Sequence, residues 1–111
     1  MIKELTIENI EGEVLDSTKP AVVKFSSENC HLCVALEPVT ERLHTKYKDK
    51  FNFYNVNTSE QEKLTEIFSD DGVPTIYIFE DGDAVEIPYP ERPDEKTGYS
   101  EKYLDEYLNN H

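Results

Sequence analysis

The two cysteines of this 111-residue chain stand close together, in the segment Cys30-His31-Leu32-Cys33. That segment directly follows an apolar run, Ala21 to Phe25, which has the composition of a buried strand. After it, apolar residues recur at three- and four-residue steps, as on an amphipathic helix: Leu32, Leu36, Val39 and Leu43. A thiol pair where a strand leads into a helix is typical of a dithiol-disulfide redox centre. The same cysteine spacing also supplies two of the four ligands in many metal sites. The strand before the motif and the helix after it are therefore what favours a redox centre.

The charge of the chain argues against two classes of partner. The sequence has 11 basic and 24 acidic residues, a formal net charge of −13. Such an acidic surface repels nucleic acid phosphates and anionic lipids, so we expect no nucleic acid and no membrane partner. No apolar stretch has the length of a membrane span, and the first residues lack the pattern of a secretory signal. We therefore expect a cytoplasmic protein.

Hydrophobic periodicity predicts alternating strands and helices in one domain over residues 1–111. Strands are expected at residues 5–7, 21–26, 51–56, 75–79 and 84–87. Helices are expected around residues 10–15, from 31 to about 48, from 58 or 59 to 68, and over the closing segment that contains residues 103–108. Pro38 falls inside the second helix and should kink it. Asp81-Gly82 is a hairpin turn, and the proline-rich residues 88–98 form a loop.

This order of elements, together with the motifs, resembles the thioredoxin family over nearly the whole chain. The landmarks that carry the resemblance are Phe25, Cys30, Cys33, Pro38, Gly72-Val73-Pro74-Thr75 and the Asp81-Gly82 turn. The resemblance implies an α/β, thioredoxin-like three-layer fold, in which a central mixed β-sheet is flanked by helices. It also implies a cis peptide bond before Pro74, which faces the dithiol, and thiol-disulfide oxidoreductase activity without a cofactor or metal.

The position of each cysteine predicts its role in catalysis. Cys30 stands where a helix begins, and the unpaired amides and dipole of that end stabilise a thiolate. We predict that Cys30 attacks the substrate disulfide and that Cys33, one turn further, resolves the mixed disulfide. His31, as an imidazolium, would favour the Cys30 thiolate. The alternative is that His31 is only a solvated residue at the start of the helix, and the sequence leaves both open.

The resemblance also implies how a substrate is bound. Val73 would offer its backbone to an extended substrate segment as an added strand, and Pro74 would wall the site. The expected partners are disulfide-containing proteins and an electron donor like thioredoxin reductase, with the chain acting as a monomer.

The loop from Pro88 to Gly98 is a further candidate for substrate binding. Its prolines stiffen it, Tyr89 and Tyr99 offer amphipathic rings, and Arg92 is a candidate for docking a substrate carboxylate. We expect the loop to narrow the range of substrates. The alternative is a solvated insertion that contacts nothing.

Two departures from the family pattern leave other functions open. Asn29 stands where thioredoxins carry a tryptophan, and Lys24 replaces a buried aspartate that assists proton transfer. We expect the Lys24 stem to pack while its amine reaches water, so that it does not replace the aspartate as a proton shuttle. One alternative function is a binding module with regulatory cysteines. Another is a metal site in which His31 or His44 joins the two cysteines, which would still lack a fourth ligand.

Overall fold

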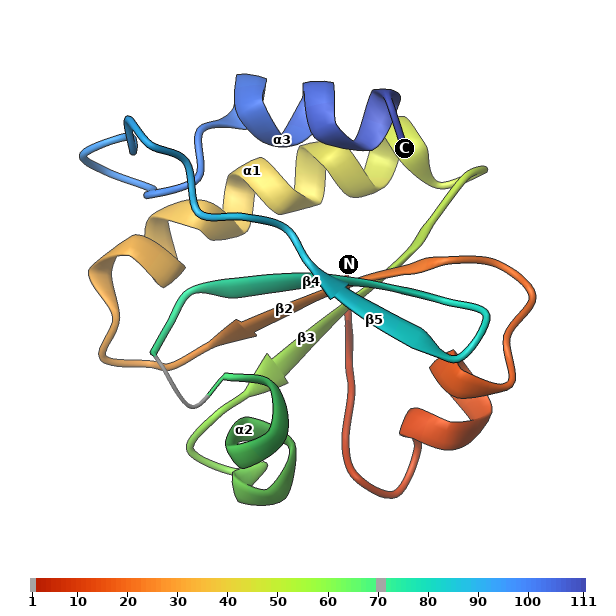
Figure 1. The fold of residues 1–111 in the computed structure, drawn as a ribbon. Helices are drawn as coiled ribbons and strands as arrows, with labels where there is room; N and C mark the ends of the chain where they lie inside the picture. The colour runs from red at the N-terminus through yellow and green to blue at the C-terminus, as the bar shows by residue number, and fades with distance from the viewer. Residues whose placement is uncertain (1, 70–71) are drawn as a thin grey trace.

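The computed structural model of this chain describes residues 2–69 and 72–111. It contains a five-stranded mixed sheet that lies between two layers of helices (Figure 1). In chain order the elements are β1 (Lys3–Glu4), the π-helix η1 (Glu11–Leu15), β2 (Ala21–Ser26), α1 (His31–Tyr47), β3 (Asn52–Asn57), α2 (Glu62–Phe68), β4 (Thr75–Glu80), β5 (Asp83–Glu86) and α3 (Glu101–Asn109). The strands lie in the order β1-β3-β2-β4-β5. The predicted three-layer α/β fold is thereby confirmed.

Strand β2 is the centre of the sheet, as its apolar composition predicts. It pairs in parallel with β3 and antiparallel with β4, so both of its edges are hydrogen-bonded within the sheet. Its side chains alternate between the two faces, with Val22 in one core cluster and Val23 and Phe25 in the other. The helix that follows β2 is therefore anchored to the most buried strand of the molecule.

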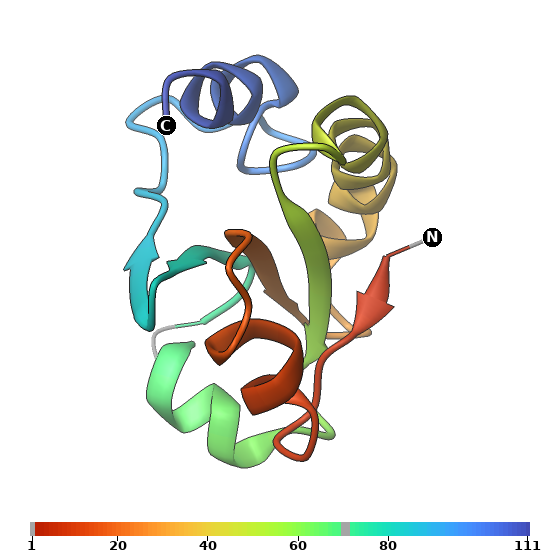
Figure 2. The ribbon, with the colours of Figure 1, turned by 90° about the vertical axis from the view of Figure 1, so that its right-hand side faces the viewer.

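Helices cover both faces of the sheet (Figures 1 and 2). Helices α1 and α3 pack on one face, where the largest side chains of the core include Leu36, Phe51, Tyr99 and Leu104. Helix α2 and η1 pack on the other face, around Phe25, Val56 and Leu64. Both clusters are apolar, so burial on the two faces of one sheet holds the three layers together.

The turn between β4 and β5 has the geometry that its sequence predicts. Asp81 and Gly82 have φ angles of 53° and 84°, and both central residues of a type I′ hairpin turn require such positive values. Strand β5 spans Asp83–Glu86, one residue earlier than expected, and Ile87 just after it is buried in the core. The start of the long loop is therefore fixed by a buried side chain.

The first predicted strand is wrong in its position. Strand β1 is Lys3–Glu4, paired with β3, rather than residues 5–7. Leu5 still donates from its backbone to the Asn55 carbonyl oxygen at 2.7 Å, but its side chain points into the core. Thr6 and Asn9 then exchange side-chain to backbone hydrogen bonds that turn the chain toward η1. This local capping ends the strand where hydrophobicity alone would have continued it.

Helix α2 begins later than predicted, at Glu62 instead of residue 58 or 59. The Thr58 amide donates to the Ser26 carbonyl oxygen at 3.0 Å, and the Ser59 amide donates to Asn57 Oδ1 at 2.9 Å. These bonds hold an Asx-type turn in place of a first helical turn. Ile67 of this helix has 67% of its surface exposed.

Candidate active site

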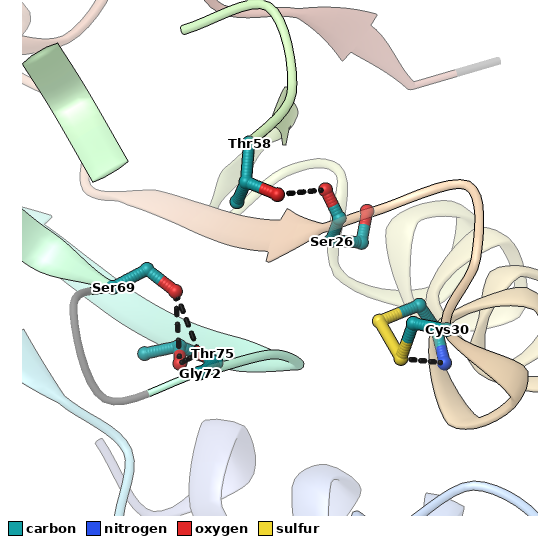
Figure 3. The surroundings of a disulfide bond; sticks show 7 residues. Ser26, Cys30, Thr58, Ser69, Gly72 and Thr75 are labelled. Atoms are coloured by element: carbon teal, nitrogen blue, oxygen red, sulfur yellow. Dashed lines mark hydrogen bonds between the residues drawn. A yellow bond between two sulfur atoms is a disulfide. The ribbon is translucent and has the colours of Figure 1, made fainter. Parts of the chain in front are cut away.

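The two cysteines lie where β2 leads into α1, and they form a disulfide with a Cα–Cα distance of 5.1 Å. Cys30 has an extended backbone and is the N-cap of α1, so it precedes the first residue of a 17-residue helix. Its sulfur accepts a hydrogen bond from the Cys33 amide at 3.1 Å (Figure 3). The helix continues through Pro38, and its first turn contains no acidic residue. The positive end of the helix therefore faces the Cys30 sulfur through the Cys33 amide, and no carboxylate lies on that turn.

The two sulfur-bearing residues differ in exposure. Cys33 is 1% exposed, whereas Cys30 is only partly buried. An incoming disulfide can therefore reach Cys30 more readily than Cys33. This arrangement fits the predicted division between an attacking and a resolving thiol, which stays a prediction because the disulfide is closed.

The peptide bond between Val73 and Pro74 is cis, as the resemblance implies. The segment that carries it is held by two hydroxyl groups from the end of α2 and the start of β4. Ser69 Oγ and Thr75 Oγ1 each donate to the Gly72 carbonyl oxygen at 2.7 Å (Figure 3). These two hydrogen bonds were not predicted from the sequence, although a serine and a threonine beside a Gly-x-Pro segment are a signal for such bonds.

A groove of about 380 Å³ brings together residues from the motif, the cis-proline segment and the long loop. Its lining includes Leu32 from the motif and Val73 and Pro74 from the cis-proline segment. Tyr89 from the loop and Ile67 from α2 also line it. The dithiol motif, the stretch from α2 through the cis-proline segment, and the long loop thus form one concave surface.

Tyr89 and Tyr99 both belong to the lining of this groove, but they differ in exposure. Tyr89 is 45% exposed, but Tyr99 is only 1% exposed and donates from its hydroxyl to the Ile87 carbonyl oxygen at 3.1 Å. Burial raises the pKa of the Tyr99 phenol far above its ordinary value. The expectation that Tyr99 offers its ring to a partner is therefore wrong, since Tyr99 is a core residue on which Tyr89 packs.

Two other candidate site residues, His31 and Arg92, lie outside the groove. His31 is exposed at the first position of α1, and Arg92 is exposed near the middle of the loop. Neither is among the residues that line the groove. The structure therefore groups Val73, Pro74 and Tyr89 in one groove, whereas His31 and Arg92 are exposed outside it.

The amine of Lys24 is buried, contrary to expectation. Lys24 is 2% exposed, and its Nζ donates to Thr40 Oγ1 at 3.3 Å. Burial lowers the pKa of this amine, and the carboxylates of Glu37, Glu4 and Glu41 oppose that shift. Lys24 stands on the central strand, and α1 covers it. Its side chain therefore does not reach water, and the amine lies beneath the helix with acidic groups around it.

The geometry gives no support to a metal site. Within residues 2–69 and 72–111 there is no group of three or more histidine, cysteine or acidic side chains that could hold a metal ion. The His44 ring, one of the ligands considered, packs against Phe53 with 5.3 Å between ring centroids.

None of the helices in the described part of the chain has the length and apolar character needed to cross a membrane.

Comparison with known proteins agrees with this geometry. The family model for thioredoxin matches residues 1–99. A thioredoxin from Peptoclostridium acidaminophilum is 33% identical over 86 residues, covering 78% of each chain. Thioredoxin 1 from Nostoc sp. is 30% identical over 84 residues, covering 76% of this chain and 78% of that protein. The chloroplastic thioredoxin M4 of Arabidopsis thaliana is 32% identical over 73 residues, 66% of this chain but only 38% of that protein.

The residues that the family model matches include the dithiol and the cis-proline segment. They favour an oxidoreductase over the alternative of a binding module with regulatory cysteines. The family match, the Cys30–Cys33 disulfide and the cis peptide at Pro74 agree, and this chain belongs to the thioredoxin family of thiol-disulfide oxidoreductases.

Proposed function

We propose that this oxidoreductase reduces disulfide bonds in proteins, with Cys30 as the attacking thiol and Cys33 as the resolving thiol. The observation that carries the proposal is the N-cap position of Cys30. Its sulfur accepts the Cys33 amide at 3.1 Å, on a helix end that favours negative charge. Because Cys33 is buried one turn further, it is protected until a mixed disulfide has formed beside it.

The first step consumes the Cys30 thiolate. Its sulfur attacks one sulfur of the substrate, the substrate S–S bond breaks, and the departing sulfur leaves with the electron pair and takes a proton from water. The product is a mixed disulfide between Cys30 and the substrate. His31, which follows Cys30 in the chain and is exposed, would favour the thiolate when its ring carries a proton.

The second step closes the Cys30–Cys33 bond. Cys33 loses its proton and attacks the Cys30 sulfur, and the bond from Cys30 to the substrate breaks. The second substrate sulfur leaves as a thiolate and is protonated by water. The substrate gains two electrons and becomes a dithiol, while the protein becomes the disulfide form that the structure contains.

The residues around the dithiol would hold the substrate during both steps. Val73, which is partly exposed before a buried proline, would pair its backbone with an extended substrate segment. Pro74 has no amide hydrogen to compete for that pairing. Tyr89 would contact the segment within the groove, and Arg92 would meet an acidic group on the more distant surface of a protein partner.

Regeneration requires an electron donor for the disulfide. Members of the thioredoxin family are reduced by thioredoxin reductase, and we infer a donor of that kind here. Such a cycle runs in a reducing compartment, and we propose the cytoplasm and a monomeric protein. A relative in Arabidopsis thaliana carries the name chloroplastic, so a compartment assay on the living cell is the test of location.

The proposal is tested by catalysed reduction of a disulfide-bonded protein such as insulin, with dithiothreitol as the electron donor. The parent protein should accelerate the reduction severalfold over dithiothreitol alone. Cys30→Ser should abolish the acceleration. Cys33→Ser should instead accumulate a covalent mixed disulfide through Cys30, visible by mass spectrometry. Full activity of the Cys30→Ser variant would refute the proposed mechanism.

A further inference from the structure

Helix α3 meets different surroundings on its different sides. Its buried leucines belong to the core beneath it. On one flank, Glu101 and Asp105 form ion pairs with basic side chains of α1. Because two residues along a helix turn by about 200°, the side chains two positions after these, Tyr103 and Tyr107, lie on the opposite flank. This second flank faces away from α1.

The flank that faces away from α1 carries a surface hollow of about 340 Å³. Tyr103, Glu106 and Tyr107 of α3 line it, together with Asn110 and His111 just after the helix. Among the described residues, those that line the hollow all belong to this one end of the chain. The hollow is therefore a feature of the helix surface, not a gap between two layers of the fold.

Two tyrosine rings form the apolar part of the hollow. The centroids of Tyr103 and Tyr107 are 6.3 Å apart, and their planes are inclined by 52°. The Tyr103 ring is held in place, because its hydroxyl donates to the Pro88 carbonyl oxygen at 2.6 Å and the ring stacks on buried Tyr99. A cation above the two rings can lie within about 6 Å of both centroids, which is the range of a cation–π interaction.

The charges around the hollow also suit a cation. Glu106 is exposed in its lining, and the described part of the lining contains no lysine or arginine. The His111 ring is hydrogen-bonded to Glu80 Oε1 at 2.9 Å, which places a second carboxylate beside a lining residue. Lys102 lies one turn before Glu106 on α3, outside the lining. With a net charge of −13 on the whole chain, a basic partner is attracted from a distance as well.

The hollow lies away from the dithiol. Helices α1 and α3 run side by side in the same direction (Figure 1). Lys50 Nζ, just after α1, donates to the Leu108 carbonyl oxygen at 2.7 Å, so Tyr107 lies near the end of α1. Cys30 caps the beginning of that 17-residue helix, which is about 25 Å long. A partner held in the hollow therefore need not cover the dithiol.

We propose that this hollow is a docking site for an arginine side chain on a basic segment of a partner protein. The guanidinium would stack on the Tyr107 ring and donate hydrogen bonds to the Glu106 carboxylate. Arginine suits such a site better than lysine, because its planar, weakly hydrated head stacks on aromatic faces and donates from its edge. Docking there is separate from the disulfide chemistry, so it gives the oxidoreductase a second surface with which to recruit a partner.

The experiment titrates two short peptides into the isotope-labelled, oxidised protein at low ionic strength and follows its backbone amides by NMR. One peptide carries two arginines separated by glycine, and the other carries two lysines in their place. The arginine peptide should shift the amides around Tyr107 and Glu106 most strongly. It should bind about threefold more tightly than the lysine peptide, the size of effect expected for a cation–π contact at an exposed site.

Variants separate the ring from the charge, and the spectrum of each variant shows that it is folded. Tyr107→Leu keeps apolar bulk without an aromatic face and should abolish the preference for arginine, whereas Tyr107→Phe should keep it. Glu106→Gln should weaken both peptides about threefold. Glu66→Gln, which makes the same change of charge at an exposed position of α2, is the matched control and should leave both affinities nearly unchanged. All four variants should reduce insulin as the parent does.

Equal affinity of the parent for the two peptides would overturn the proposal. An undiminished arginine preference in Tyr107→Leu, or shifts spread over the acidic surface instead of α3, would also overturn it. Shifts of the α3 amides that grow with protein concentration alone would show that a second copy of this chain occupies the hollow, and would overturn it too. Failure of the parent to reduce insulin would refute the proposed function, and the peptide titration would still decide the docking proposal.

Discussion

At the scale of single residues, the most unusual group in this protein is the buried amine of Lys24. It lies on the central strand beneath α1, with Thr40 as its hydrogen-bond partner and the carboxylates of Glu37, Glu4 and Glu41 around it. Burying a cation costs free energy that such partners recover only in part. Glu4 and Glu37 are themselves exposed, so water would solvate them if the amine were removed.

Replacement of the amine should therefore stabilise the protein. We expect Lys24→Met to raise the free energy of unfolding at neutral pH by about 1–2 kcal/mol, because an unbranched apolar side chain fills the same space without charge. Urea denaturation measures the change. The control is Lys46→Met, since Lys46 is an exposed lysine paired with Asp105 and should show no such gain.

The pH dependence of this gain has a definite sign. Burial lowers the pKa of Lys24 in the folded protein, whereas the unfolded chain keeps the ordinary value of about 10.4. Between these two values the unfolded chain binds more protons, so the parent becomes more stable as pH rises. The advantage of Lys24→Met should shrink from pH 7 toward pH 10. An advantage that grows over this range, or a loss of stability at pH 7, would contradict the burial of the charged amine.

Among single residues, conformations set by local backbone geometry could be predicted from the sequence. Burial set by long-range packing could not. The Asp81-Gly82 turn and the N-cap position of Cys30 depend on local geometry, so they could be predicted. The burial of Tyr99 and of the Lys24 amine depends on what lies above them. The loop of residues 88–98 covers Tyr99, and α1 covers the Lys24 amine. Contacts between segments that are distant in the sequence set the positions of both groups.

At the scale of elements, the helices and strands follow the sequence wherever a long apolar pattern exists. Helix α1 and strands β2 and β4 match their predicted ranges closely, because each buries a continuous face. The errors fall at short elements, β1 and the start of α2. There, side chains of Asn9 and Asn57 bond to nearby backbone and decide the boundary. The groove could not be predicted, since it combines residues from distant parts of the chain, such as Leu32, Val73 and Tyr89.

Helix α3 offers a test of one such capping contact. Ser100 is its N-cap, and the hydroxyl oxygen accepts from the Tyr103 amide at 3.1 Å. Ser100→Ala should lower the free energy of unfolding by about 1 kcal/mol, whereas Ser100→Asp should retain the cap. Thermal or urea unfolding compares the two variants. Equal stability of the parent and Ser100→Ala would show that the cap contributes nothing.

At the scale of the whole molecule, the excess of acidic residues should oppose folding. The net charge of −13 on 111 residues produces self-repulsion that is strongest in the compact state. The ion pairs that join α1 to α3, Arg42–Glu101 and Lys46–Asp105, are exposed and contribute little. Added salt should therefore weaken the repulsion between acidic residues more than the attraction within these ion pairs.

Added salt should accordingly raise the melting temperature. We expect a higher Tm in about 0.5 M sodium chloride, where screening acts within a few ångströms, than at low ionic strength. Potassium chloride, with a different cation and the same ionic strength, is the control for specific ion effects and should give the same increase. A melting temperature that falls with salt would mean that attractive pairs dominate the electrostatics of this protein.

The central claim, that Cys30 is the exposed and activated thiol, is tested most directly by alkylation of the reduced native protein. Limiting iodoacetamide is added, and peptide mapping by mass spectrometry follows the modification of each cysteine over time and pH. We predict that Cys30 is modified first, with a midpoint of reactivity below the pH of about 8.5 typical of a free thiol, while Cys33 stays protected. Faster modification of Cys33, or equal rates at both cysteines, would contradict the account.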